Sequence, residues 1–118
     1  MSYGYYSEVY FAVSIDNPRA FKVGETVNGR RRSNQLFKQN KYWIEKTYFT
    51  GLTEANRLLA ESFLRSKMES FSYVKRLQGL DYFICETSEQ VQFLQDNFMS
   101  YVEEIINIIT TIKFLKTP

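Results

Sequence analysis

The fold is decided by three short stretches near the N-terminus: Val9-Tyr10-Phe11, then Lys22-Val23-Gly24-Glu25-Thr26, then Asn28-Gly29-Arg30-Arg31-Arg32. Aromatic and β-branched residues in the first two stretches predict strands over residues 6–14 and 20–23. The intervening Asp16-Asn17-Pro18-Arg19 is typical of a turn, because Asp and Asn hydrogen-bond locally and Pro restricts φ. We therefore expect a β-hairpin.

A basic helix is predicted directly after the hairpin. Gly24 marks a place where the backbone turns sharply or lies close to another group. Asn28 is a suitable N-cap, and the helix is expected to extend to about Lys38 and to bury Leu36 and Phe37. Its three successive arginines lie in the first turn, where the helix dipole disfavours positive charge, which favours selection for an anion.

The rest of the chain alternates between predicted strands and helices. A strand is expected over residues 42–49, a helix over 53–70, short strands at Tyr73-Val74 and 81–86, and a long helix over 88–114 that begins with a capping box at Thr87. The 53–70 helix is expected to use one broad face, formed by Ala55, Leu58, Leu59, Ser62, Phe63 and Ser66. The last helix has the most regular apolar spacing, at Val91, Leu94, Phe98, Tyr101, Val102, Ile105, Ile109 and Ile112.

These elements predict a small α/β (α+β) domain. We expect one domain over residues 1–118, with a three-stranded, mostly antiparallel sheet flanked by helices. The chain shows no internal repeat, no low-complexity segment and no linker.

Composition excludes several classes of site. The 118 residues include no histidine and a single cysteine, Cys85, which is expected to be a buried small hydrophobic residue. Histidine-dependent catalytic triads, histidine-ligated metals, zinc clusters and an internal disulfide are therefore excluded. Any metal must bind through oxygen ligands.

We expect a soluble, cytoplasmic protein. The N-terminus lacks the pattern of a signal peptide, and the apolar runs are far shorter than the ~20 residues that cross a bilayer.

Charge is distributed unevenly along the chain. Residues 19–46 contain eight Lys and Arg against two Glu, whereas residues 77–112 contain six acids and no Lys or Arg. The first half is thereby suited to a polyanion, although an ordinary solvated helix face is the alternative.

At this point the chain resembles the GIY-YIG nuclease superfamily, especially its short phage and bacterial branch. Glu8-Val9-Tyr10 stands at the first motif and Lys22-Val23-Gly24 at the second, with eleven residues between Tyr10 and Lys22. A more literal match, Gly4-Tyr5-Tyr6, would leave fifteen residues before Lys22 and is rejected.

Further positions of the resemblance follow in order. Thr26, Asn28 and Arg32 match the positions expected after Gly24, Glu61 falls at the metal-ligand position, and Gly79-Leu80-Asp81-Tyr82-Phe83 is similar to a strand of the branch. The resemblance covers about residues 8–86 and leaves the 88–114 helix outside. The chain departs from the pattern by having Lys22 in place of a tyrosine and by lacking a clear counterpart of a late asparagine.

The resemblance implies a metal-dependent endonuclease that hydrolyses DNA phosphodiester bonds. Glu61 would hold Mg²⁺ or Mn²⁺, Tyr10 would orient or deprotonate the attacking water, Arg32 would stabilise charge on the phosphate, and Lys22 would contact phosphate or water. DNA and its phosphates would also be contacted by Gly24, Thr26, Arg30, Arg31, Lys38 and Lys41.

Each of these residues also has a plainer interpretation. Tyr10 is equally suited to a core, Arg32 to a surface, and Glu61 to an ion pair with Arg65. Tyr42 and Trp43 suit either base stacking or a core.

Two other functions stay open. One is a catalytically inactive relative that binds DNA through the same basic face. The other is a protein-interaction module, such as a homodimer formed through the C-terminal helix.

Overall fold

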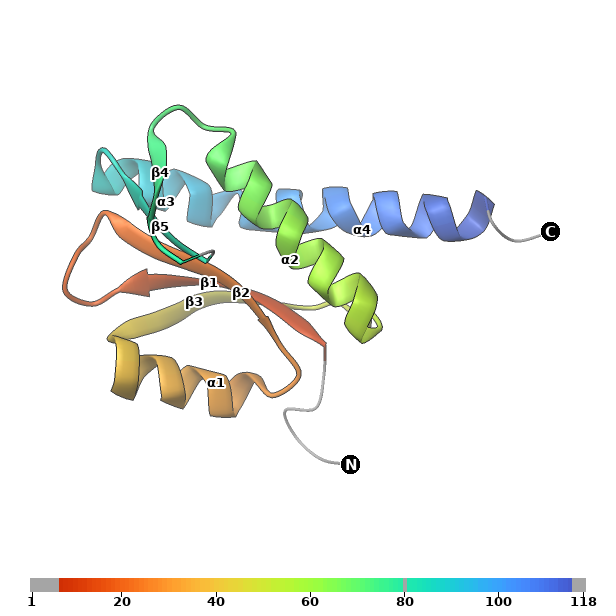
Figure 1. Cartoon of the computed structure of the whole chain (residues 1–118), viewed down its shortest axis with the longest axis horizontal. Helices are drawn as coiled ribbons and strands as arrows, with labels where there is room; N and C mark the ends of the chain where they lie inside the picture. Colours follow the sequence, from red (N-terminus) through yellow and green to blue (C-terminus); the bar gives the residue numbers. More distant parts are fainter. Residues whose placement is uncertain (1–6, 80, 116–118) are drawn as a thin grey trace.

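The computed structural model describes residues 7–79 and 81–115. The rejected motif Gly4-Tyr5-Tyr6 and Leu80 of the Gly79–Phe83 segment lie outside the described residues. Five strands form one sheet: β1 (Glu8–Ser14), β2 (Ala20–Thr26), β3 (Tyr42–Phe49), β4 (Val74–Gln78) and β5 (Tyr82–Cys85). Their order is β3-β1-β2-β5-β4, and every neighbouring pair is antiparallel (Figure 1).

The predicted α+β class is confirmed, but the expected three-stranded sheet is wrong. The two short segments after residue 70 form a hairpin, β4–β5, which extends the sheet because β5 pairs with the free edge of β2. Strands of four and five residues have little alternation to detect. The pairing of β5 with β2 is a long-range contact that local patterns do not predict.

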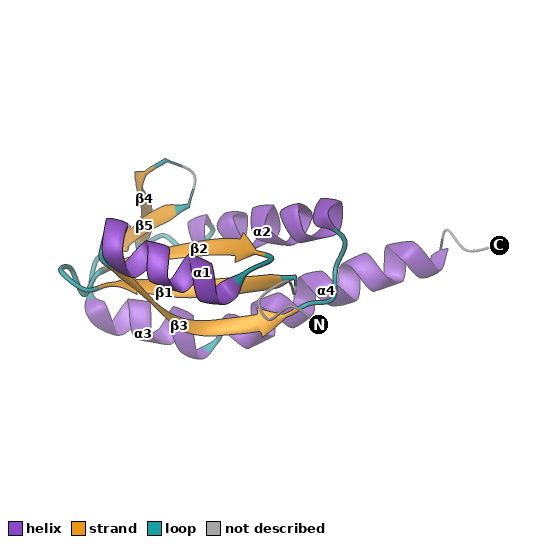
Figure 2. Ribbon diagram, turned by 90° about the horizontal axis from the view of Figure 1, so that it is seen from below, coloured by secondary structure: helices purple, strands orange, loops and turns teal. Residues whose placement is uncertain are grey.

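The sheet separates two hydrophobic clusters. Val9, Phe11, Phe21 and Val23 point to the face covered by α2 (Glu54–Glu69), α3 (Ser88–Asp96) and α4 (Phe98–Leu115). Tyr10 and Ala12 point to the opposite face, where they pack with Leu36 and Tyr42 under α1 (Gly29–Gln35). Figure 2 shows α1 on its own side of the sheet. Cys85 is buried, as predicted.

The basic helix ends differently from the prediction. Asn28 caps it as expected, since its Oδ1 accepts a hydrogen bond from the Arg31 backbone N–H. The last turn, η1 (Leu36–Asn40), is a π-helical turn, after which Lys41 adopts a left-handed conformation with φ of 59°. Leu36 is buried, but Phe37 is 43% exposed, so its predicted burial is wrong.

Helix α2 packs through a face other than the predicted one. Its buried residues are Arg57, Ala60, Leu64 and Met68, whereas Leu58 and Leu59 are about half exposed. The Arg57 guanidinium pairs with Glu25 of β2, which brings this arginine onto the buried face. Arg57 thus shares the buried face with three apolar residues, and of the predicted positions only Phe63 also packs against the core.

The predicted C-terminal helix is interrupted once. Thr87 forms the expected capping box, but Asn97 ends α3, and its side chain donates a hydrogen bond to the Phe93 carbonyl. Asparagine competes with the backbone in this way, which disfavours a continuous helix. On α4 beyond the break, Ile108 and Ile112 are exposed, and a homodimer through this helix stays a prediction. No helix in the described residues is long and apolar enough to cross a membrane.

One close approach fixes the hairpin. Tyr10 lies opposite Gly24 in the β1–β2 register, and a Cβ atom added to Gly24 would lie 2.3 Å from the Tyr10 hydroxyl oxygen. Only glycine leaves room for the phenol ring to cross the neighbouring strand.

We expect Gly24→Ala to lower the free energy of unfolding by about 1–3 kcal/mol, because the ring must move out of a packed site. In a Tyr10→Leu background the same substitution should cost much less, since the three atoms nearest to the new Cβ all belong to the Tyr10 phenol and are gone. Urea unfolding of the four proteins in this double-mutant cycle measures the coupling. Equal costs in both backgrounds would contradict the close approach.

Candidate active site

Tyr10 and Arg32 form the first contact of the candidate site. The Tyr10 side chain is 1% exposed, and its hydroxyl accepts a hydrogen bond of 3.1 Å from Arg32 Nε. The Arg32 Nη1 donates to the Gln35 Oε1 one helical turn later, at 2.8 Å. The phenol is thus part of the core and also holds a guanidinium in a fixed orientation.

Lys22 of β2 is the next residue of the candidate site, and it lies beside the Tyr10 ring. Its side chain is buried, and its Nζ lies 5.7 Å from the centre of the Tyr10 ring and 4.8 Å from that of Tyr82. The same Nζ donates to Asp81 Oδ2 at 3.2 Å. A buried ammonium therefore has one carboxylate and two aromatic faces around it, as a desolvated cation requires.

Glu61 of α2 is connected to Asp81 through Arg65, which hydrogen-bonds to both. The Arg65 Nη1 donates to Glu61 Oε1 at 2.7 Å and to Asp81 Oδ1 at 2.9 Å. The Glu61–Arg65 ion pair, considered above as the plainer role of Glu61, is therefore present. Asp81 links that pair to Lys22.

The four residues predicted to be catalytic thus lie in one polar network. We use this term for Arg32, Tyr10, Lys22, Asp81, Arg65 and Glu61, which are contributed by α1, β1, β2, α2 and the turn before β5. The paired residues of β2 and β5 end at Lys22 and Tyr82, and one further bond joins the Val23 backbone N–H to the Asp81 carbonyl. Beyond it, no strand among the described residues pairs with this edge of β2. Side chains of α2 and Asp81 meet at that edge.

Burial controls protonation of the phenol. Burial raises the pKa of Tyr10 to about 12, despite the opposing hydrogen bond and charge of Arg32. The Tyr10 hydroxyl consequently keeps its proton at neutral pH. It accepts a bond from Arg32 and still has its own O–H to donate.

The pKa values of the other titratable groups in the network are also shifted: those of Lys22 and Asp81 are lowered, and that of Glu61 is raised. Burial lowers the pKa of Lys22, although Asp81 opposes this shift. Burial acts to raise the pKa of Asp81, but Lys22 and Arg65 together hold it below its ordinary value. Burial raises the pKa of Glu61, and the Asp81 charge adds to this effect.

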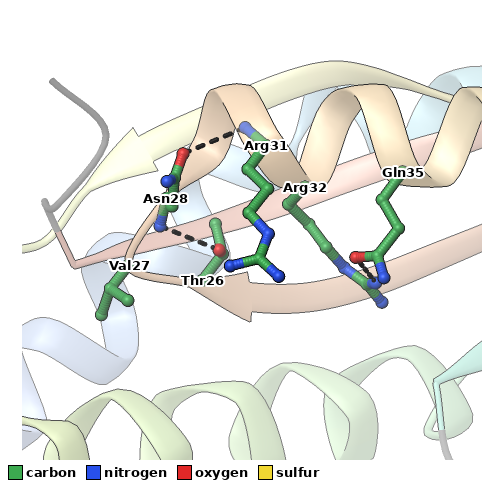
Figure 3. A pocket seen from close by; sticks show the side chains of 6 residues that line it. All are labelled: Thr26, Val27, Asn28, Arg31, Arg32 and Gln35. Carbon is green, nitrogen blue, oxygen red and sulfur yellow. Dashed lines mark hydrogen bonds between the residues drawn. The ribbon is translucent and has the colours of Figure 1, made fainter.

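A surface hollow of about 220 Å³ lies beside the network. It is lined by Thr26, Val27, Asn28, Arg31, Arg32 and Gln35. Figure 3 shows the Arg31 and Arg32 side chains extending from α1 towards β2, with Arg31 next to Thr26. The Thr26 hydroxyl accepts from the Asn28 backbone N–H and so shapes the turn into α1. Two guanidinium groups in one hollow are suited to an oxyanion.

Three of the predicted basic contacts are not brought into this hollow. Arg30 lines a separate groove of about 270 Å³ with Glu8, Ser33, Ile44 and Thr47. Lys38 and Lys41 lie on and after η1, several residues further along the chain. None of the three belongs to the polar network.

A metal would have few protein ligands here. The described residues contain no cluster of three or more Asp, Glu or Cys side chains placed to hold an ion. Both Asp81 oxygens accept from cations, whereas Glu61 Oε2 has no hydrogen-bond partner among the described residues. The donor set therefore fits a cation bound by one carboxylate oxygen and otherwise by water, as Mg²⁺ permits.

Sequence reasoning missed Asp81 and Arg65 as members of the site. Both have a local signal: Asp81 directly precedes an apolar strand, and Arg65 follows Glu61 by four residues. Their convergence on Lys22 depends on the β2–β5 pairing, which was not predicted. Comparison of the chain with protein-family models, curated proteins and solved structures gave no significant match.

Asp81→Asn should lower the free energy of unfolding at pH 7 by about 2 kcal/mol. This value lies below the ~3–5 kcal/mol of a fully buried pair, because the Asp81 side chain is 30% exposed. A carboxyl with a lowered folded pKa stabilises the fold above its unfolded pKa and loses that contribution as the pH falls through the folded value. The difference between wild type and variant should therefore shrink below pH 3.8, the ordinary pKa of Asp81.

Urea unfolding between pH 7 and pH 2 measures this difference. Asp16→Asn, which removes an exposed carboxylate in the β1–β2 turn, is the matched control and should have little effect. A constant loss for Asp81→Asn across the whole pH range would contradict an ionised Asp81 as the partner of Lys22.

Proposed function

We infer that the protein is a metal-dependent endonuclease that hydrolyses DNA phosphodiester bonds. The observation that supports this most is the polar network, in which Tyr10, Lys22, Arg32 and Glu61 converge from separate elements beside a hollow with two arginines. The four residues to which the resemblance to GIY-YIG nucleases assigns catalytic roles are among those that converge.

The phosphate would bind at Arg31 and Arg32. Arg32 is already oriented by Tyr10 and Gln35, so little side-chain freedom remains to be lost on binding. Its guanidinium would neutralise the charge that grows on the non-bridging oxygens in the transition state. Arg31, in the same hollow, would add a second charge-assisted contact.

Tyr10 would act chiefly by orientation. With a pKa of about 12, only roughly one Tyr10 in 10⁴ is ionised at pH 8. The hydroxyl therefore positions a water or a phosphate oxygen through its own proton, and deprotonation of the attacking water needs further help. A cation at Glu61 would supply Lewis-acid stabilisation of charge on the phosphate.

Lys22 would act electrostatically, from its buried position next to Tyr10. Its ion pair with Asp81 keeps the buried ammonium in place, and its charge lies next to the Tyr10 ring. This position favours a negative group near the phenol without requiring direct contact between Lys22 and DNA.

A DNA-binding module without catalysis is the second candidate. It is favoured by the Arg65 contact, which already occupies one oxygen of Glu61. In that case the arginine hollow would bind the backbone, and Glu61 would serve only to place Arg65.

Glu61→Gln and Arg32→Ala should each abolish metal-dependent nicking of supercoiled plasmid, since one removes the charge that holds the cation and the other the phosphate contact. Tyr10→Phe should lower the rate at least about 100-fold, because it removes the orienting hydroxyl. Gel assays at low salt with Mg²⁺, Mn²⁺ or EDTA measure these rates.

The matched controls are Glu103→Gln on α4 and Tyr73→Phe before β4, which should nick at the wild-type rate. Retained DNA binding by a Glu61→Gln protein that does not cleave would support the enzyme. Binding by a wild type that never cleaves would instead favour the inactive module, and cleavage that survives both Tyr10→Phe and Glu61→Gln would overturn the assignment.

DNA affinity should fall steeply with salt, because the contacts are to phosphates. Arg31→Ala should weaken binding to all sequences alike and reduce the salt slope by about one. Lys75→Ala, which removes an exposed lysine of β4, is the control and should leave the slope unchanged. Fluorescence anisotropy at several salt concentrations gives both slopes, and an unchanged slope for Arg31→Ala would exclude Arg31 as a phosphate contact.

A further inference from the structure

Two aromatic rings are exposed at the end of the basic helix. Phe37 of η1 is 43% exposed and Trp43 of β3 is 50% exposed. Their ring centres lie 5.6 Å apart at an interplanar angle of 78°. In such an edge-to-face pair, the ring that presents its edge has neither of its two faces in contact with the partner ring.

The pair is not explained by the core. Neither ring belongs to the two buried clusters, whereas their neighbours Leu36 and Tyr42 do. The alternatives left open for Tyr42 and Trp43 are thereby separated: Tyr42 packs against Tyr82, and Trp43 points outward to Phe37. Two large apolar rings remain in contact with water, which is costly unless they bind something.

The backbone holds these rings in place. The π-helical turn η1 contains Phe37, and left-handed Lys41, two residues before Trp43, redirects the chain into β3. The Lys41 carbonyl accepts a hydrogen bond from the Ile15 backbone N–H at 2.8 Å, which fixes this corner to the end of β1. The two rings are therefore presented by a rigid corner.

The segment that carries the pair is basic, although Glu45 follows Trp43 by two residues on β3. Lys38 and Lys41 are exposed and form no ion pair with the described residues. Residues 26–44 contain five Lys and Arg and no acidic residue. Aromatic rings beside unpaired cations are the combination with which proteins bind single-stranded nucleic acid, since bases stack and phosphates pair with the cations.

We propose that Phe37 and Trp43 form a stacking site for an unpaired DNA base, with Lys38 and Lys41 on the flanking phosphates. This inference rests on the proposed function, and it names the substrate class: DNA with a single-stranded segment next to the scissile phosphate. Phe37 follows Arg32 by five residues in the continuous α1–η1 segment, so the stacking site and the arginine that would bind the phosphate lie on one helical segment.

The test uses the fact that Trp43 is the only tryptophan of the chain. The full-length protein is titrated with an oligothymidylate single strand and with a blunt duplex of equal length, at low salt in EDTA. Trp43 emission reports stacking, and anisotropy of labelled DNA reports binding. We expect the single strand to quench Trp43 strongly, and the duplex to bind with little quenching.

Substitutions of the two aromatic residues test whether the rings stack on a base. Phe37→Ala and Trp43→Ala should each weaken single-strand binding about tenfold and leave duplex binding nearly unchanged. Phe93→Ala removes an aromatic ring of α3 that is 50% exposed, and it should change neither affinity. Trp43→Phe, which keeps an aromatic face, should restore most of the affinity lost in Trp43→Ala.

The outcomes distinguish this inference from the proposed function. Single-strand binding without any change in Trp43 emission, or equal effects of Phe37→Ala and Phe93→Ala, would overturn the stacking site and leave DNA cleavage intact. Stacking by a protein that cleaves no DNA would retain the site and overturn the nuclease. Failure to bind either form of DNA would overturn both.

Discussion

The close approach of the Tyr10 ring to Gly24 is the constraint on which the candidate site depends. A side chain at position 24 would meet the phenol, so glycine there lets the ring lie across the hairpin with its hydroxyl towards α1. Arg32 is then oriented by that hydroxyl, and Lys22 lies against the same ring. The hairpin, the first helix and the buried lysine are thus coupled through one aromatic side chain.

The second determinant is the early end of the β2–β5 ladder. Pairing stops at Lys22 and Tyr82, apart from the bond from the Val23 N–H to the Asp81 carbonyl, so the last residues of β2 have no strand on that side within the described part of the chain. Asp81 lies at this point and accepts from Lys22 on one oxygen and from Arg65 on the other. The early end of the ladder therefore lets α2, which covers one face of the sheet, contribute Arg65 to an ion pair with Asp81. Asp81 also pairs with Lys22, whose side chain lies on the opposite face with Tyr10.

Local sequence patterns predicted much of this structure, and the failures have a common cause. Asn28, Thr87 and the hairpin turn were predictable because capping and turn chemistry act over a few residues. The buried face of α2 was not, since Arg57 is turned inward by Glu25, a partner on β2 that is distant in sequence. Asp81 was missed, and the burial predicted for Phe37 was wrong, because both depend on packing and pairing made by the tertiary structure.

The residues of the polar network and their surroundings lower the stability of the fold relative to simpler alternatives. A buried ion pair such as Lys22–Asp81 stabilises no better than well-packed apolar residues would. Tyr10 requires a glycine opposite it, and glycine weakens a strand interior. Consecutive arginines oppose the dipole at the start of α1. Each feature alone has a structural explanation, but packing gives no reason for all of them to meet beside one hollow, whereas the proposed reaction at a phosphate would use cations and an orienting hydroxyl at one place.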